Sequence, residues 1–210
     1  MTSITISPTL VAELHCDLDR PHAFAAQRVG FLVCESTMEN GAWTITAQRY
    51  IAIPDSEYEN NPRVGACVSS SAFRRLRAAA HMSPVSIFHV HRHDHRGTPG
   101  FSAVDVNENK RFIPDFVNVR PELPHGAIVF SLDSASAVFL GPGQTQLARA
   151  GVQLQKPHSQ AELHHGQPTQ SSKLPRGNVG SDHQERDRSS HWIVRWWLAC
   201  VAAIGAYWRR

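Results

Sequence analysis

The composition of this chain of 210 residues changes near Gly141–Gly143, and this change limits what can fold. Before it, apolar runs alternate with turn-forming residues. After about residue 153 the chain is rich in Gln, Ser, His, Pro and Arg and poor in core-forming side chains. Such a segment buries too little apolar surface to offset the entropy lost on ordering. We therefore expect a folded domain over residues 1–150, a disordered linker over 151–190 and an apolar helix over 191–210.

The last stretch, "HWIVRWWLACVAAIGAYWRR", is strongly apolar. Its uninterrupted apolar part, Trp196–Trp208, is shorter than the ~20 residues that span a bilayer. The stretch fits a membrane anchor, an interfacial helix or a helix packed on the main domain, and the sequence leaves these three open. The first residues lack the basic and long apolar regions of an export signal, so we expect a cytoplasmic protein.

Hydrophobic spacing in the first 150 residues predicts three helices and five strands. The helices are expected at residues 8–19, 70–81 and 102–112, and the strands at 27–35, 42–54, 85–91, 126–131 and 136–141. Ser7 and Pro8 form a typical helix start, and "ENG" at 39–41 is a hairpin signal. The order α-β-β-α-β-α-β-β predicts an α/β fold with a single mixed sheet flanked by helices.

Several functional classes lack their signals in this chain. The formal net charge is only +3, and no basic stripe with interleaved aromatic residues indicates nucleic-acid binding. The four cysteines are far apart and form no CxxC pair, which argues against a zinc ribbon or a disulfide framework. The sequence also contains no HExxH, no phosphate loop ending in GK[ST] and no GxSxG.

The stretch "FHVHRHDHRGTPGFSAVD", residues 88–105, carries the clearest functional signal. His89 and His91 are two apart at the end of a predicted strand, so both imidazoles point to one face. Two imidazoles on one face suit Zn²⁺, and Asp105 in the next helix can supply a third ligand. His93 and His95 are alternative ligands or partners that orient the ligands. Read separately, two histidines are a weak signal, and Ser102 with Asp105 also forms a helix-capping pattern.

These residues resemble the JAMM, or MPN+, motif of zinc isopeptidases, which is H-x-H, a spacer, and then S-x-x-D. The spacer is about three residues longer than in the eukaryotic deubiquitinases of the family, and the Gly/Pro segment is similar to the prokaryotic JAB branch. "QRVGFLVC" resembles the first core strand of the family. The resemblance covers residues 3–142 and implies the MPN/JAB fold, a cytidine-deaminase-like sheet flanked by helices.

The resemblance also implies roles for individual residues. His89, His91 and Asp105 would bind zinc, and Ser102 would hydrogen-bond the tetrahedral oxyanion. Zinc would polarise the scissile carbonyl and lower the pKa of its bound water towards ~7. The family places a glutamate general base three residues before the strand glycine, and here Gln27 stands at that position.

A glutamine amide orients a water molecule but does not accept its proton, and general-base catalysis typically contributes ~10²–10⁴-fold. We rank loss of the base above replacement by another residue; the replacements considered are Glu13, Glu35, His93 and His95. The resemblance implies a zinc isopeptidase acting on ubiquitin-like modifier conjugates or precursors, in the context of a bacterial antiphage operon. The alternative is a binding module that keeps the metal and the modifier but does not cleave. A scaffold with purely structural histidines is a third option.

Overall fold

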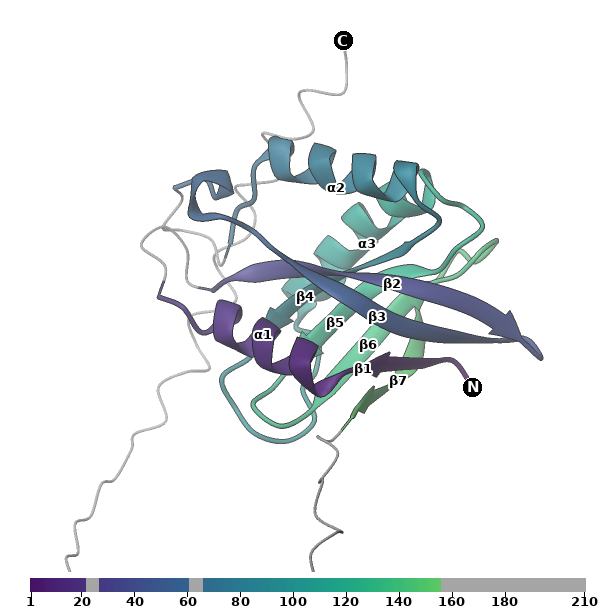
Figure 1. Cartoon of the computed structure of the whole chain (residues 1–210), viewed down its shortest axis with the longest axis horizontal. Coiled ribbons are helices and arrows are strands. Elements are labelled where there is room, and N and C mark those ends of the chain that lie inside the picture. Colours follow the sequence, from purple (N-terminus) through teal and green to yellow (C-terminus); the bar gives the residue numbers. More distant parts are fainter. Residues whose placement is uncertain (22–26, 61–65, 156–210) are drawn as a thin grey trace, which may run out of the picture.

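The computed structural model describes residues 1–21, 27–60 and 66–155 (Figure 1). The expected linker beyond residue 155 and the apolar stretch 191–210 lie outside the described residues. The last strand runs to Leu154, past the expected domain boundary at residue 150. None of the helices in the described part of the chain is long and apolar enough to cross a membrane.

Seven strands form one closed mixed barrel in the order β1-β3-β2-β4-β5-β6-β7 (Figure 1). They are β1 (Ser3–Ile6), β2 (Val29–Glu39), β3 (Ala42–Ala52), β4 (Ser86–Arg92), β5 (His125–Phe130), β6 (Ala135–Leu140) and β7 (Ala148–Leu154). The helices of the described residues are α1 (Pro8–Leu18), α2 (Ser70–Met82) and α3 (Ala103–Val117), with a short 3₁₀ turn, η1 (Asp55–Glu57).

The predicted fold class, an α/β sheet flanked by helices as in MPN/JAB domains, was wrong. The protein is mostly sheet, and that sheet is closed. The two strands that close it, β1 and β7, are the two that hydrophobic spacing did not predict. β1 pairs in parallel with β3 on one side and with β7 on the other. Without them, the remaining five strands form the open mixed sheet that the sequence suggested.

Several predicted elements are confirmed. α1 begins after Ser7, whose side chain accepts a hydrogen bond from the backbone N–H of Leu10, and Pro8 occupies the first turn. The hairpin between β2 and β3 turns at Asn40 and Gly41, which have φ angles of 51° and 76°. Two successive positive φ angles are typical of a type I′ turn, which matches the right-handed twist of a hairpin.

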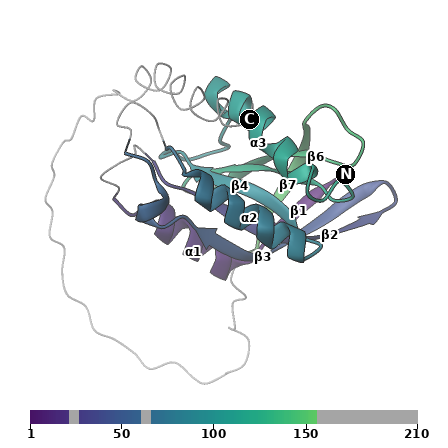
Figure 2. The same cartoon turned by 90° about the horizontal axis from the view of Figure 1, so that it is seen from above.

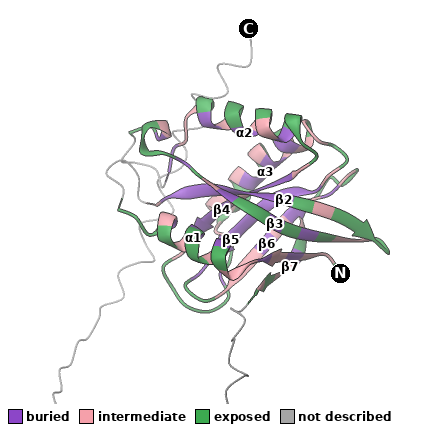
Figure 3. Cartoon of the chain, in the orientation of Figure 1, coloured by how far each residue is buried: buried purple, intermediate pink, exposed green. Residues whose placement is uncertain are grey.

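The first half of β2 and the whole of β5 are buried on both faces, which explains their near-continuous apolar sequences, whereas the β2–β3 hairpin is largely exposed (Figure 3). One face carries the larger core cluster, to which α1 contributes three leucines. The other carries a second cluster beneath α2 and α3, and it includes Phe31 and Ile87. Figure 2 shows the arrangement of α1, α2 and α3 around the barrel from above.

Alternation along β4 decides where its histidines point. Phe88 and Val90 belong to the larger cluster, whereas Ile87 belongs to the cluster beneath α2 and α3. Side chains alternate along a strand, so His89 and His91 share the face of Ile87. The imidazoles therefore point towards the helices and not into the core that α1 covers.

Candidate metal centre

β4 carries its histidines at its C-terminal end, between β2 and β5. In the antiparallel pairing of β4 with β2, His89 lies opposite Phe31 and His91 lies opposite Val29. His93 follows directly after the strand, and its backbone N–H donates to the carbonyl of Phe130 at 2.8 Å. The chain is therefore still tied to the end of β5 where His93 projects. The ring centroids of His91 and His93 are 5.1 Å apart.

The first turn of α3 supplies the carboxylate. Ser102 is the N-cap of α3, and its hydroxyl accepts a hydrogen bond from the backbone N–H of Asp105 at 3.2 Å. In return, Oδ2 of Asp105 accepts from the backbone N–H of Ser102 at 2.7 Å. This reciprocal capping box fixes the rotamer of Asp105 and turns its carboxylate back towards β4. The capping interpretation of S-x-x-D is thus confirmed, and it leaves Asp105 free to act as a ligand as well.

Three side chains converge where these elements meet. Nε2 of His91 lies 3.4 Å from Oδ1 of Asp105, and Nε2 of His93 lies 3.7 Å from Oδ2. The ligand atoms of His91, His93 and Asp105 all lie within 4.8 Å of one another. Two atoms bound at ~2.0–2.1 Å to one tetrahedral ion are about 3.4 Å apart. The two distances between histidine nitrogens and the carboxylate are close to this value, so the group could hold a divalent metal ion.

Unpaired buried nitrogens supply a second test of this fit. Among the described residues, four buried side-chain nitrogens make no hydrogen bond. They are Nδ1 of His89, both ring nitrogens of His91 and Nδ2 of Asn109. Buried polar atoms in native proteins nearly always have a partner, and here all the exceptions lie in or beside one site. A metal ion bound by His91 would supply the partner that one of its nitrogens lacks.

His89 lies next to the group but is not part of it. Its ring is 5.6 Å from that of His91, centroid to centroid, and it packs edge-on against Phe31 at 5.5 Å and Phe112 at 4.9 Å. Burial lowers the pKa of His89 to about 3, so its imidazole is neutral at ordinary pH. The predicted ligand set of His89, His91 and Asp105 stays a prediction, and the structure groups His93 with His91 instead.

The electrostatics of the group suit a cation. Burial acts to raise the pKa of Asp105, but His91 and the hydrogen bonds from Ser102 outweigh it and hold that pKa below its ordinary value. Burial, followed by the nearby His91, lowers the pKa of His93. Near neutral pH the site therefore presents an ionised carboxylate beside a neutral imidazole. These are the protonation states in which both groups bind metal.

The loop between β4 and α3 is anchored to the turn between β5 and β6. The carbonyl of His95 accepts from the backbone N–H of Leu132 at 2.9 Å. The carboxylate of Asp133 accepts from the backbone N–H of Gly97 at 2.7 Å, where Gly97 has a φ of 86°. This positive φ favours glycine and lets the chain reverse direction there. The loop thus returns to α3 with Ser102 and Asp105 in place, as the sequence order suggested.

Gln27 stands beside the start of β2 and is half-buried. It comes two residues before Val29, which lies opposite His91, so this end of β2 runs past the metal group. Its neighbour Arg28 is 2% exposed and fixes the entry into the strand. The guanidinium donates to the carbonyls of Arg20 and Pro21 at 2.8 and 2.9 Å.

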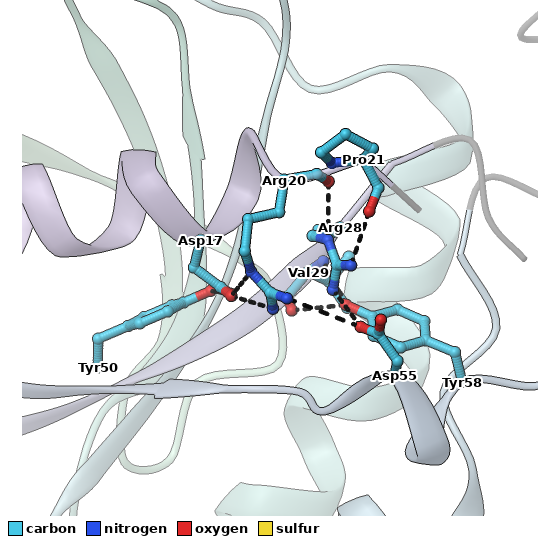
Figure 4. Close-up of polar contacts among 8 residues, drawn as sticks. All are labelled: Asp17, Arg20, Pro21, Arg28, Val29, Tyr50, Asp55 and Tyr58. Atoms are coloured by element: carbon cyan, nitrogen blue, oxygen red, sulfur yellow. Dashed lines mark hydrogen bonds and ion pairs between the residues drawn. The ribbon is translucent and has the colours of Figure 1, made fainter. Parts of the chain in front are cut away.

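Further contacts of Asp55, Tyr58 and Tyr50 complete this polar cluster (Figure 4). Arg28 pairs with Asp55 at 2.7 Å, which ties the residue before β2 to η1, the short turn after β3. The hydroxyl of Tyr58 accepts from the backbone N–H of Val29 and donates to its carbonyl, both at 3.0 Å. The hydroxyl of Tyr50 donates to Asp17 at 2.7 Å. The side chain of Arg28 and the backbone of Val29, which follow Gln27 directly, are therefore held in place.

Sequence reasoning treated His93 only as an alternative ligand and did not single out Asn109. The spacing held a signal for His93, because it continues the period of two that His89 and His91 begin. Asn109 carries a weaker signal, since it follows Asp105 by one helical turn and so shares its helix face. Glu35, considered as a substitute base, accepts a hydrogen bond from Gln48 on the β2–β3 hairpin.

No protein-family model matches the chain, and no curated protein matches its sequence. The solution structure of protein DSY2949 from Desulfitobacterium hafniense is similar, with a TM-score of 0.40 and 14% sequence identity. The match covers 77% of this chain and 99% of that one. The case for the metal site therefore stands on the geometry of this chain alone.

Proposed function

We propose that this protein is a zinc-dependent hydrolase of the isopeptidase type, acting on ubiquitin-like modifier conjugates or precursors. The observation that carries the proposal is the convergence of His91, His93 and Asp105, with ligand atoms all within 4.8 Å of one another. Two imidazoles and one carboxylate form a ligand set that zinc favours, and three protein ligands leave a fourth position open. A zinc ion held there would polarise a carbonyl group and make a water molecule nucleophilic near neutral pH.

The motif supports the same chemistry when its first half begins at His91. An H-x-H motif made of His91 and His93 shortens the spacer before Ser102 by two residues compared with one made of His89 and His91. That removes most of the excess length relative to the isopeptidase motif that the sequence resembles. We therefore propose His91, His93 and Asp105 as the zinc ligands, with His89 behind them.

The chain's own residues have separate tasks in this proposal. The backbone N–H of Ser102 holds Oδ2 of Asp105, so the carboxylate keeps its orientation towards the histidines. The hydroxyl of Ser102 accepts from the backbone N–H of Asp105, and its own hydrogen can still donate to an oxyanion. Gln27 can orient a water molecule through its amide but cannot take its proton.

Gln27 favours one alternative, a module that binds zinc and modifier but does not cleave. The experiment compares zinc-loaded wild type with Gln27→Glu on a linear fusion of ubiquitin to a fluorescent reporter. The isopeptidase proposal predicts cleavage by Gln27→Glu at a rate ~10²–10⁴-fold above that of wild type. Cleavage by both at similar rates would mean that another residue accepts the proton.

Two controls make this comparison specific. Gln153→Glu introduces the same charge at an exposed position of β7 and is expected to leave the rate unchanged. His91→Ala combined with Gln27→Glu removes a proposed ligand and is expected to abolish cleavage. If Gln27→Glu binds zinc but cuts neither this fusion nor an isopeptide-linked diubiquitin, the isopeptidase proposal fails and the binding module remains.

A further inference from the structure

We propose that Asn109 is a positioning residue of the metal centre. Its side-chain amide would hydrogen-bond Nδ1 of His91, which orients that ring, and Nδ1 of His89. The inference rests on the zinc site proposed above and adds a residue to it. It starts from the unpaired buried nitrogens. Apart from Nε2 of His91, which faces Asp105, the three that remain are Nδ1 of His91, Nδ1 of His89 and Nδ2 of Asn109.

The position of Asn109 follows from its helix. It comes four residues after Asp105 and three before Phe112 on α3, so the three side chains lie along one helix face. Asp105 contacts His91, with 3.4 Å between Oδ1 and Nε2. Phe112 contacts His89, with 4.9 Å between ring centroids. Helical spacing puts Asn109 between these two contacts along α3, and from this we infer that its side chain faces the interval between the two imidazoles.

Burial leaves these groups few other partners. Asn109 is 2% exposed and His91 is 1% exposed. An unpaired polar group in such surroundings destabilises the folded protein, so an asparagine is an unfavourable residue at a helix position that packs against a sheet. Ile113 and Phe116 fill the neighbouring buried positions of α3 with apolar side chains. The exception falls beside the metal group, which indicates a task connected with it.

The donors and acceptors of the three groups are complementary. If Nε2 of His91 binds the metal, the ring proton is on Nδ1, and metal-binding histidines almost always donate this N–H to an acceptor. The amide carbonyl of Asn109 is such an acceptor, and rotation of the amide exchanges the places of its oxygen and nitrogen. The amide N–H can then donate to Nδ1 of His89 when that ring carries its proton on Nε2. All three nitrogens gain a partner in this way.

This chain of hydrogen bonds also gives His89 a role outside the ligand set. Its Nδ1 accepts from Asn109, which fixes the direction of the amide. Asn109 in turn fixes the ring orientation and the tautomer of His91. The metal ligand is thus held on both sides, by Asp105 near Nε2 and by Asn109 at Nδ1.

The test measures zinc affinity by competition with a chromogenic chelator, using the full chain and two substitutions at one site. Asn109→Leu removes the acceptor and keeps the branched shape and the number of heavy atoms, and we expect zinc affinity to fall by about 10- to 100-fold. Asn109→Asp keeps the acceptor, and we expect affinity to stay within threefold of wild type or to rise. Asn107→Leu on the exposed face of the same helix is the matched control and should not change affinity.

Thermal unfolding of the metal-free variants separates positioning from packing. If Asn109 positions His91, the two variants should rank in opposite order for zinc affinity and for metal-free stability. Asn109→Leu should bind zinc more weakly than wild type but be at least as stable without metal. Asn109→Asp should retain zinc affinity but be less stable than wild type without metal. Equal zinc affinity for wild type and Asn109→Leu would overturn the proposal. So would an equal loss in both variants, because a purely structural residue would behave in that way.

Imidazole nitrogen spectra of the zinc-loaded wild type supply a readout that needs no variant. We expect His91 to show a proton on Nδ1 with slow solvent exchange, and a metal-bound Nε2. A metal-bound Nδ1 in His91 would overturn the positioning role while leaving the zinc site intact. If the wild type binds no zinc, the metal centre itself is wrong, and this result is distinct from the others.

Discussion

Oδ2 of Asp105 accepts a hydrogen bond from the backbone N–H of Ser102 at 2.7 Å, while Oδ1 of the same carboxylate lies 3.4 Å from Nε2 of His91. The same carboxylate thus caps α3 and faces the histidines that follow from β4. A helix start is a favourable place for an anionic ligand, because the helix dipole and the free N–H groups stabilise its charge. The site is therefore built at the point where a strand ends and a capped helix begins.

The identity of the second histidine ligand is the first prediction. We expect His93→Ala to weaken zinc binding by more than the about 10–100-fold that is typical when only an orienting residue is lost. His89→Ala should stay within that smaller range, because His89 lies outside the group of ligand atoms. The dissociation constant for zinc decides this, with the exposed His95→Ala as control. The reverse order would favour His89, His91 and Asp105 as the ligands.

The second prediction separates the helix cap made by the hydroxyl of Ser102 from the hold that its backbone N–H has on Asp105. Ser102→Ala removes the hydroxyl that accepts from Asp105, so we expect the metal-free protein to lose about 1 kcal/mol of unfolding free energy. Zinc affinity should change little, because the backbone N–H that holds Oδ2 remains. Urea unfolding and zinc titration measure the two effects, and Ser102→Thr should restore stability. An unchanged unfolding curve would show that the cap contributes nothing.

The third prediction is that the shape of the Arg28 guanidinium, and not only its charge, stabilises the folded protein. Its guanidinium reaches two carbonyls and Asp55 from a buried position, which requires a planar group with several N–H donors. Arg28→Lys keeps the charge but not this geometry, and we expect a loss on the order of 1–3 kcal/mol in urea unfolding. Asp55→Asn should cost less, because that side chain is 57% exposed. Equal costs for the two variants would contradict this assignment.

The fourth prediction is that buried His125 makes the unfolding free energy depend on pH. Its Nδ1 accepts from the backbone N–H of Ile87 at 3.0 Å, and burial lowers its pKa from 6.5 to about 4. On acidification the unfolded chain takes up this proton near pH 6.5 and the folded protein only near pH 4. The stabilisation is therefore complete above 6.5 and is lost between those values, by on the order of 3 kcal/mol.

Urea unfolding between pH 4 and 7 measures this dependence. We expect His125→Gln to be less stable at pH 7 and to lose less stability than wild type on acidification, because one titrating group is gone. His89, whose pKa is lowered to about 3, keeps part of the slope in both proteins. Parallel curves for the two proteins would show that His125 does not titrate as described.

Local signals explain which elements the sequence predicted. The Ser7–Pro8 cap, the Asn40–Gly41 turn and the helical spacing in residues 70–81 act within a few residues, and each appears in the structure. The strand that presents His89 and His91 and the S-x-x-D cap that presents Asp105 are local in the same sense. They were sufficient to locate the candidate site.

Non-local pairing explains what was missed. Ile4 and Ile6 are fully buried, yet β1 has only four residues and its alternation is too short to predict a strand. β1 forms because it pairs with β3 and with β7, which lies at the far end of the described chain. No local pattern records a parallel pairing between such distant segments, so closure of the sheet could not be predicted.

The amino-acid sequence by itself determined the helices, five of the strands and the stretch in which a metal could bind, because capping, turn and periodicity signals act between near neighbours. Only the tertiary structure decided that the sheet closes, that His93 joins His91 and Asp105, and that Asn109 is buried with an unpaired Nδ2. Closure depends on the pairing of β1 with β3 and with β7, and the grouping at the site depends on how β4 and α3 lie against each other. That arrangement comes from packing between segments that share no local signal.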